Sequence, residues 1–155
     1  MSLLEWAEDM SVGVPELDAD HKGLIAVVNR LEASVKDRKG RNVIRQCLYD
    51  LLSYAEVHFK REERVMAACH FPGLEHRKDE HRDFVEKIRD FLHRSEGDPD
   101  AAAAIVSEQL LDFLKGWFHH HVLIEDMAYR PYVKGSAAAR EAARSFRAAE
   151  MWWDS

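Results

Sequence analysis

The stretch His58-Phe59-Lys60-Arg61-Glu62-Glu63 carries a histidine and a carboxylate four residues apart, on one face of a predicted helix. Apolar residues recur on the same face at three- and four-residue steps, which indicates an amphipathic α-helix. His58 and Glu62 therefore fall where core residues belong. A buried carboxylate needs a partner, so either a metal ion binds both side chains or they form an ordinary pair on the helix surface. The apolar members of this stripe are Ile44, Cys47, Leu48, Leu51, Leu52, Ala55 and Met66.

The repeated amphipathic pattern predicts an all-α fold. Helices are expected over about residues 18–39, 42–68, 74–94 and 100–130, the last ending before Pro131. Asp18 is the expected N-cap of the first helix. Short connections favour an antiparallel up-down-up-down four-helix bundle. Residues 1–17 lack helical periodicity and contain Gly13 and Pro15, so they are predicted to form an N-terminal extended arm.

The residues after the fourth helix have a different composition. We divide the chain into a bundle over residues 1–134 and a C-terminal helical extension over residues 135–155, with Ser136 as the expected helix cap. The apolar stripe of this extra helix is predicted to pack on the bundle, and if it were exposed it would offer a site for a protein partner. The stripe comprises Ala139, Ala142, Ala143, Phe146 and Ala149.

Composition narrows the class of protein. A chain of 155 residues with a net charge of −6 is typical of one acidic domain and argues against nucleic-acid binding through electrostatics. Two cysteines are too few for a disulfide framework. The N-terminus has no basic, apolar leader, and no segment is apolar enough to span a membrane. We therefore expect a cytoplasmic protein that does not bind membranes.

Each predicted helix contributes side chains that bind metals. Five histidines and two carboxylates exceed the four ligands of a tetrahedral zinc site but suit two metal ions bridged by the carboxylates. With three histidines on one metal and two on the other, one metal keeps an open position where dioxygen can bind. For the second carboxylate, helix geometry favours Glu125 over Asp126, because Glu125 lies four residues after His121. The other candidates are His21, His58, Glu62, His76 and His81.

Several spaced motifs resemble those of the hemerythrins, specifically the bacterial hemerythrin-like proteins, over roughly residues 3–132. Myohemerythrin, a relative, is itself an up-and-down bundle. The matching motifs are Leu17-Asp18-x-x-His21-Lys22, His58-Phe59-x-x-Glu62-Glu63-x-x-Met66, Phe71-Pro72-Gly73 and Trp117-Phe118-x-x-His121-Val122-x-x-x-Asp126-x-x-Tyr129.

The resemblance implies a centre of two non-haem iron ions with an oxo or hydroxo bridge. It implies that dioxygen binds reversibly at the open iron, and it favours Asp126 over Glu125. In this assignment His21 and His58 hold the open iron, Glu62 and Asp126 bridge the two ions, and the fully coordinated iron is held by His76, His81 and His121.

The third helix departs from the family pattern. The family has H-x-x-x-H there, whereas position 77 is arginine and the available pair, His76 and His81, is five residues apart. On a straight α-helix the two rings would point about 140° apart. A π-bulge or an irregular helix start would bring them together, and otherwise His76 is a surface histidine.

Apolar side chains are expected to line the dioxygen pocket, because water would promote loss of bound oxygen and oxidation of the iron. Each of them also suits an ordinary core. The candidates are Leu24, Ile25, Phe59, Trp117 and Phe118.

Reversible dioxygen binding, for storage, delivery or sensing, is thus the predicted function, and the protein is not expected to be an enzyme. A di-iron oxidase or peroxidase is one alternative, and a metal-storage or signalling module is another. Five nitrogen ligands and the absence of a Glu-x-x-His motif favour binding over oxidation chemistry.

Overall fold

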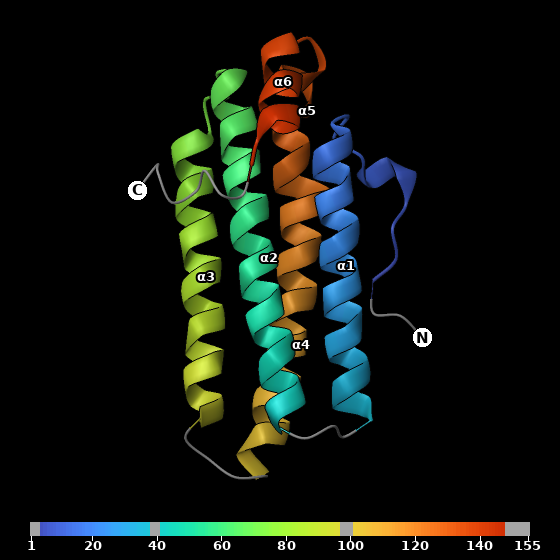
Figure 1. The fold of residues 1–155 in the computed structure, drawn as a ribbon, viewed down its shortest axis with the longest axis vertical. Coiled ribbons are helices and arrows are strands. Elements are labelled where there is room, and N and C mark those ends of the chain that lie inside the picture. The colour runs from blue at the N-terminus through green and yellow to red at the C-terminus, as the bar shows by residue number, and fades with distance from the viewer. Residues whose placement is uncertain (1–3, 38–40, 97–100, 148–155) are drawn as a thin grey trace.

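The computed structural model describes residues 4–37, 41–96 and 101–147, which fold as an antiparallel up-down-up-down four-helix bundle (Figure 1). The predicted fold class is confirmed. The first three rods of the bundle are α1 (Pro15–Lys36), α2 (Arg41–Ala68) and α3 (Leu74–Glu96). The fourth rod consists of α4 (Ala101–His120), a π-helical turn η2 (His121–Glu125) and α5 (Asp126–Lys134), and the short helix α6 (Ala137–Ser145) follows it.

The first helix begins at Pro15 rather than at Asp18, so the predicted cap is wrong. Proline is favoured in the first turn of a helix because its fixed φ suits the helix and its missing N–H has no partner there. Asp18 instead accepts hydrogen bonds from the Ser11 hydroxyl at 2.5 Å and from the Val12 N–H at 3.0 Å. These bonds fasten the N-terminal arm, which contains the short turn η1 (Glu8–Met10), to the start of α1.

The fourth rod was predicted as one α-helix that ends before Pro131, but it changes geometry at η2 and continues through Pro131 to Lys134. The Asp126 N–H bonds to the His121 carbonyl across five residues, which defines the π-helical turn. Proline removes one backbone hydrogen bond from α5. The buried side chains of Tyr129 and Val133 hold this helix in place on either side of it.

Two apolar clusters form the core. The main core cluster fills most of the bundle and includes Leu24, Phe59, Phe84, Leu110 and Val122. The second core cluster lies beyond the π-helical turn, and it comprises Val12, Val14, Leu17, Val65, Met66, Tyr129, Val133, Ala139 and Ala143. Along three of the rods the clusters are separated by buried polar residues, which form the centre described below.

Helix α6 packs on the end of the bundle, against α2 (Figure 1). Ser136 caps it as predicted, since its hydroxyl accepts a hydrogen bond from the Ala139 N–H at 3.0 Å. Ala139, Ala143 and Phe146 are buried, so this part of the predicted stripe faces the bundle rather than a partner. Ala149 lies outside the described residues, and the division into residues 1–134 and 135–155 stays a prediction.

Replacing Phe146 by alanine is expected to lower the free energy of unfolding by about 3 kcal/mol, the usual cost of a lost buried phenyl ring. The ring is only 4% exposed, and the guanidinium groups of Arg61 and Arg64 lie 5.1 and 5.0 Å from its centroid. Urea denaturation followed by circular dichroism measures the change. Ala138→Ser, at an exposed position of α6, is the control and should change stability by less than about 0.5 kcal/mol. Equal stabilities of the two variants would contradict the docking of this segment.

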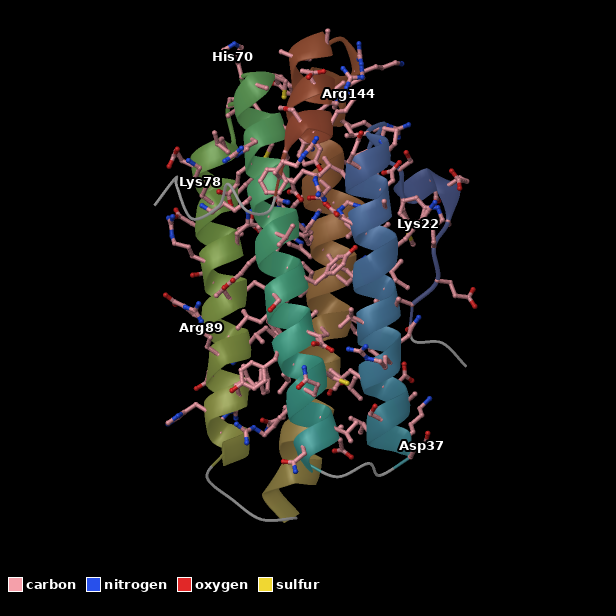
Figure 2. All side chains as sticks on the ribbon, viewed as in Figure 1. Lys22, Asp37, His70, Lys78, Arg89 and Arg144 are labelled. Carbon is pink, nitrogen blue, oxygen red and sulfur yellow. The ribbon has the colours of Figure 1, made fainter. Side chains whose placement is uncertain are left out.

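Charged side chains cover the outside of the bundle, as the labelled Lys22, Asp37, Lys78, Arg89 and Arg144 illustrate (Figure 2). Within the described segments, no helix combines the length and apolar character needed to cross a membrane.

Candidate metal centre

Five side chains from three of the rods converge in the interior, between the two core clusters. They are His21 on α1, His58 and Glu62 on α2, His121 in η2 and Asp126 on α5. None of them is more than 2% exposed. One nitrogen or carboxylate oxygen from each lies within 4.8 Å of the others, a spacing that a metal ion can satisfy.

The atoms that face one another in this cluster have no hydrogen-bond partner among the described residues. They are Nε2 of His21, His58 and His121, Oε2 of Glu62 and Oδ2 of Asp126. The closest pairs are His21 Nε2 to Asp126 Oδ2 and His58 Nε2 to Glu62 Oε2, each at 2.9 Å. Buried polar atoms without partners are rare, and an absent ion is one ordinary explanation for them. Imidazole nitrogen and carboxylate oxygen are donors that suit iron and zinc.

Carboxylates outside the cluster orient two of the histidine rings. Nδ1 of His58 donates to Asp20 at 3.1 Å, and Nδ1 of His81, on α3, donates to Glu63 at 2.8 Å. Metal-binding histidines commonly donate their second ring N–H to a carboxylate, which turns the other nitrogen toward the metal. Nε2 of His81 lies 3.5 Å from Glu62 Oε1 and has no hydrogen-bond partner among the described residues, so this ring borders the cluster.

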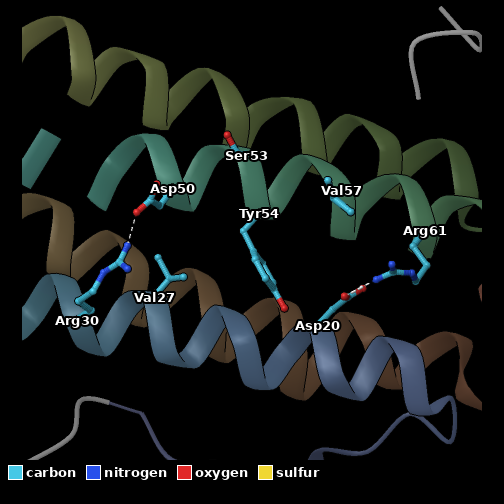
Figure 3. A pocket seen from close by; sticks show the side chains of 8 residues that line it. All are labelled: Asp20, Val27, Arg30, Asp50, Ser53, Tyr54, Val57 and Arg61. Carbon is cyan, nitrogen blue, oxygen red and sulfur yellow. Dashed lines mark hydrogen bonds and ion pairs between the residues drawn. The ribbon is translucent and has the colours of Figure 1, made fainter. Parts of the chain in front are cut away.

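Asp20 and Glu63 did not appear among the predicted site residues. A cleft of about 480 Å³ runs between α1 and α2, and Asp20 lies at one end of it together with Arg61, which also donates to its carboxylate (Figure 3). The position of Asp20 directly before His21 gave no signal of this role, because its partner His58 lies on another helix.

Arg77 has the largest fully buried side chain among the described residues, and it enters the cluster from α3. Its Nη2 donates to Glu62 Oε1 at 2.7 Å and to the Asp126 carboxylate, and it lies 3.1 Å from Nδ1 of His121. Its Nη1 donates to Glu80 at 3.3 Å. Burial disfavours the charged guanidinium, but Glu62 and Asp126 outweigh this effect and raise the pKa of Arg77 above its usual value.

Burial sets the charge of the histidines that lack a strong partner. It lowers the pKa of His21 to about 3 and holds the pKa of His121 well below its usual value, so both rings are neutral near pH 7 and each keeps one nitrogen without a proton. Burial opposes protonation of His58 as well. The hydrogen bond from His58 to Asp20 and the adjacent Glu62 carboxylate outweigh that effect and raise the pKa of His58 to about 9, so a metal must displace a proton there.

The two carboxylates of the cluster shift in opposite directions. Burial raises the pKa of Glu62, but the adjacent rings of His121, His58 and His81 outweigh this effect and hold that pKa well below its usual value. Burial and the neighbouring charge of Glu62 hold the pKa of Asp126 well above its usual value. Two carboxylates this close resist being ionised together unless a cation lies between them.

Comparison with known families gives a match over residues 12–133 to the model described as the hemerythrin HHE cation binding domain. The chain belongs to the hemerythrin family. It is 25% identical over 134 residues to a bacteriohemerythrin of Stenotrophomonas maltophilia, covering 86% of this chain and 84% of that one. It is 28% identical over 127 residues to a bacteriohemerythrin of Clostridium acetobutylicum, covering 80% of this chain and 96% of that one.

Solved hemerythrin structures share the fold. A crystal structure of a hemerythrin point mutant aligns with a TM-score of 0.73 at 24% identity, over 87% of this chain and all of that one. At that identity the likeness supports the arrangement of the helices, and the roles of individual residues rest on the geometry of this chain.

The structure brings six of the seven predicted hemerythrin ligands together or to the edge of the cluster, and His76 is the exception. Its side chain is 72% exposed and lies 3.4 Å from Glu80 at the surface. Helix α3 is regularly α-helical from Leu74, without the π-bulge that would have aligned His76 with His81, so the two rings point in different directions. The prediction of His76 as a ligand is therefore corrected to a surface histidine.

The choice between Asp126 and Glu125 is explained by the π-helical turn. A π-helix closes its hydrogen bonds over five residues, so His121 and Asp126 face the interior together. Glu125 is partly exposed and pairs with His120 at 2.9 Å. Regular α-helix geometry favours Glu125. That expectation is wrong because the π-helical turn changes the helical pitch, and the sequence does not reveal this change.

The hemerythrin resemblance implies two iron positions, and the residues of this chain suit one of them better than the other. At the first, the unpaired atoms of His21, His58, Glu62 and Asp126 converge and fit a single ion. The second requires two nitrogen ligands from the third helix, and α3 supplies only His81 there. The guanidinium of Arg77 lies against the carboxylates that the second ion would share, so the residues present do not fit it.

The predicted dioxygen-pocket residues all belong to the main core cluster or pack against it. Leu24, Ile25, Phe59 and Phe118 are buried and Trp117 is partly buried. The Trp117 ring stacks on His121 at 4.4 Å between centroids, and the Phe59 ring stacks on His81 at 4.0 Å. Phe59 and Trp117 thus place aromatic rings against the cluster, and the contact of the five residues with dioxygen stays a prediction.

Replacing Asp20 by asparagine is expected to weaken metal binding by about 10–100-fold, the usual effect of losing the carboxylate behind a ligating histidine. The neutral amide no longer stabilises the His58 ring in the tautomer that turns Nε2 toward the cluster. Competition titration with a chromophoric chelator measures the affinity. Asp50→Asn is a matched control, because Asp50 lies at the other end of the same cleft and pairs with the surface groups Arg30 and Gln46 (Figure 3). A similar affinity of both variants would exclude a role for Asp20 in orienting His58.

Proposed function

We propose that this hemerythrin-family protein binds non-haem iron at the centre formed by His21, His58, Glu62 and Asp126, and that it binds dioxygen there reversibly. One observation carries the proposal: buried nitrogen and oxygen atoms from three helical rods face one another without hydrogen-bond partners among the described residues. Hemerythrin-family proteins are generally oxygen-binding proteins rather than enzymes, and the proposal follows that pattern.

The donor set supports iron as the metal. Two histidines with a carboxylate, and with coordination positions left open, suit ferrous iron. Bound ferrous iron supplies the electron density with which dioxygen can interact. The chain supplies one neutral imidazole directly, because burial keeps His21 unprotonated, and a second from His58 once a metal displaces its proton. The rings of Phe59 and Trp117 lie against His121 and keep water away from the centre.

The surroundings also support a role inside a reducing compartment. Cys47 is buried in the main core cluster, Cys69 is partly buried, and both are free thiols. Such thiols persist where the medium is reducing. We accordingly propose a cytoplasmic protein.

The test loads the protein with ferrous iron without oxygen, counts the iron and records absorption spectra before and after oxygen is admitted. An absorption band that grows with oxygen and disappears when oxygen is removed supports reversible binding. Irreversible conversion with consumption of an added reductant would replace the proposal by an oxidase. A protein that takes up zinc but no iron would overturn it. Glu62→Gln is the paired variant, because it removes one proposed ligand charge without changing the side-chain shape.

A further inference from the structure

We infer that this centre holds one metal ion rather than two, and that the guanidinium of Arg77 takes the place of the second ion. The inference rests on the proposed function in one respect, namely that the centre binds a metal. It concerns the number of ions and the residue that sets this number.

The position of Arg77 is the first support. It lies one turn before His81 on the regular helix α3, so both side chains face the interior. The hemerythrin pattern has a ligand nitrogen at that four-residue step. The side chain of Arg77 reaches Glu62 and Asp126, which are the carboxylates that two ions would have to share.

The chemistry of the side chain is the second support. A guanidinium only donates hydrogen bonds and stays charged, so Arg77 cannot act as a ligand. It does satisfy carboxylate oxygens in the way a cation does. Its donor nitrogen is 2.7 Å from Glu62 Oε1, an oxygen that a bridging carboxylate would turn toward the second ion. The other oxygen of Glu62 remains unpaired and faces His58.

Charge is the third support. One divalent ion together with the guanidinium slightly exceeds the charge of two carboxylates, and a bound hydroxide would neutralise the excess. Two divalent ions beside a buried, fixed positive charge would leave a large excess in an apolar interior, which is costly. Arg77 is 1% exposed, so water does not screen its charge.

His121 is the fourth support. Its Nδ1 lies 3.1 Å from Nη2 of Arg77, and since the guanidinium only donates, Nδ1 must accept. The neutral ring then carries its proton on Nε2, which faces Glu62 at 3.5 Å and Asp126 at 3.4 Å. In that tautomer neither ring nitrogen of His121 is free to bind a metal, because Nδ1 accepts from Arg77 and Nε2 carries the proton, so the second ion loses another nitrogen ligand.

Metal counting on the full-length protein tests the inference. The protein is loaded with excess ferrous iron without oxygen, freed of unbound metal and analysed by elemental analysis and native mass spectrometry. We expect one iron per chain in the wild type and two per chain in Arg77→His, a doubling, because this variant restores a ligand nitrogen four residues before His81. Electron paramagnetic resonance of the oxidised samples gives a second readout, since a single ferric ion gives a signal that a coupled ferric pair lacks.

Two control variants complete the test. His76→Ala should still bind one iron, because its ring is at the surface, and so should Arg77→Gln, which removes the charge without adding a ligand that suits iron. Two irons in the wild type would overturn the inference and leave the proposed function standing. One iron in Arg77→His, with native helix content, would overturn the assignment of Arg77. Absence of bound iron from the wild type would overturn the proposed function itself.

Discussion

Iron affinity should fall by more than about 100-fold when His58 is replaced by alanine, because losing only the carboxylate behind a ligand costs about 10–100-fold. His58 uses both ring nitrogens: Nδ1 donates to Asp20 at 3.1 Å, and Nε2 lies 2.9 Å from Glu62 in the middle of the cluster. Its removal takes a ligand away and leaves Asp20 paired with Arg61. Anaerobic titration against a competing chelator measures the affinity, and circular dichroism reports whether the bundle is intact.

His119→Ala is the control for this experiment. His119 is exposed on α4, two residues before His121, so its ring lies outside the cluster. Its replacement should leave the iron affinity unchanged. If His58→Ala and His119→Ala bind iron equally well, the metal lies elsewhere and the proposed centre is wrong.

Replacing Arg77 by methionine should lower the free energy of unfolding of the metal-free protein by about 3–5 kcal/mol, the usual cost of removing one partner from a buried ion pair. Methionine fills much of the same volume but leaves Glu62 and Asp126 without their shared cation. The raised pKa of Asp126 indicates that this carboxyl is already poised to take up a proton, so the loss should be smaller in mildly acidic solution, where protonation removes the repulsion. Urea denaturation at two pH values measures both effects.

Arg82→Met is the matched control on the same helix. The side chain of Arg82 is 64% exposed and pairs with Asp79 at the surface, so its replacement should change stability by less than about 0.5 kcal/mol. A loss of stability in Arg77→Met no larger than in this control would mean that the buried guanidinium does not stabilise the carboxylates.

The sequence was sufficient for the bundle because helical periodicity depends on residues that are close together in the chain. The predicted apolar stripe of α2 recurs at the helical period, and the structure buries it apart from Ile44 and Leu52, which are partly buried. Boundaries were less accurate. Pro15 opens α1 where Asp18 was expected, and α5 passes through Pro131, because arm contacts and packing decide these ends.

The centre was harder to predict than the fold. The histidines and carboxylates of the bundle could be found because they interrupt apolar stripes. The π-helical turn, which brings Asp126 rather than Glu125 inward, leaves no periodic signal in a sequence. The sequence shows arginine at position 77, but its role was not predicted, because arginine is not a metal ligand and the place in the pattern was given to His76. Arg77 lies four residues before His81, the spacing that the hemerythrin pattern has between its two ligands. The structure shows that α3 is a regular α-helix here, so Arg77 and His81 lie on the same face.

The polar layer at the centre also divides the hydrophobic core. Leu17 and Leu24 on α1 lie in different clusters with His21 between them, and Phe59 and Val65 on α2 are separated in the same way by Glu62. Apolar packing therefore does not run continuously along these helices. The cooperativity of unfolding depends on the interactions within the polar layer that lies between the two apolar clusters. The guanidinium shared by Glu62 and Asp126 joins α2 to the fourth rod at this level. We therefore expect the two ends of the bundle to unfold as one unit only while the charges of that layer are neutralised.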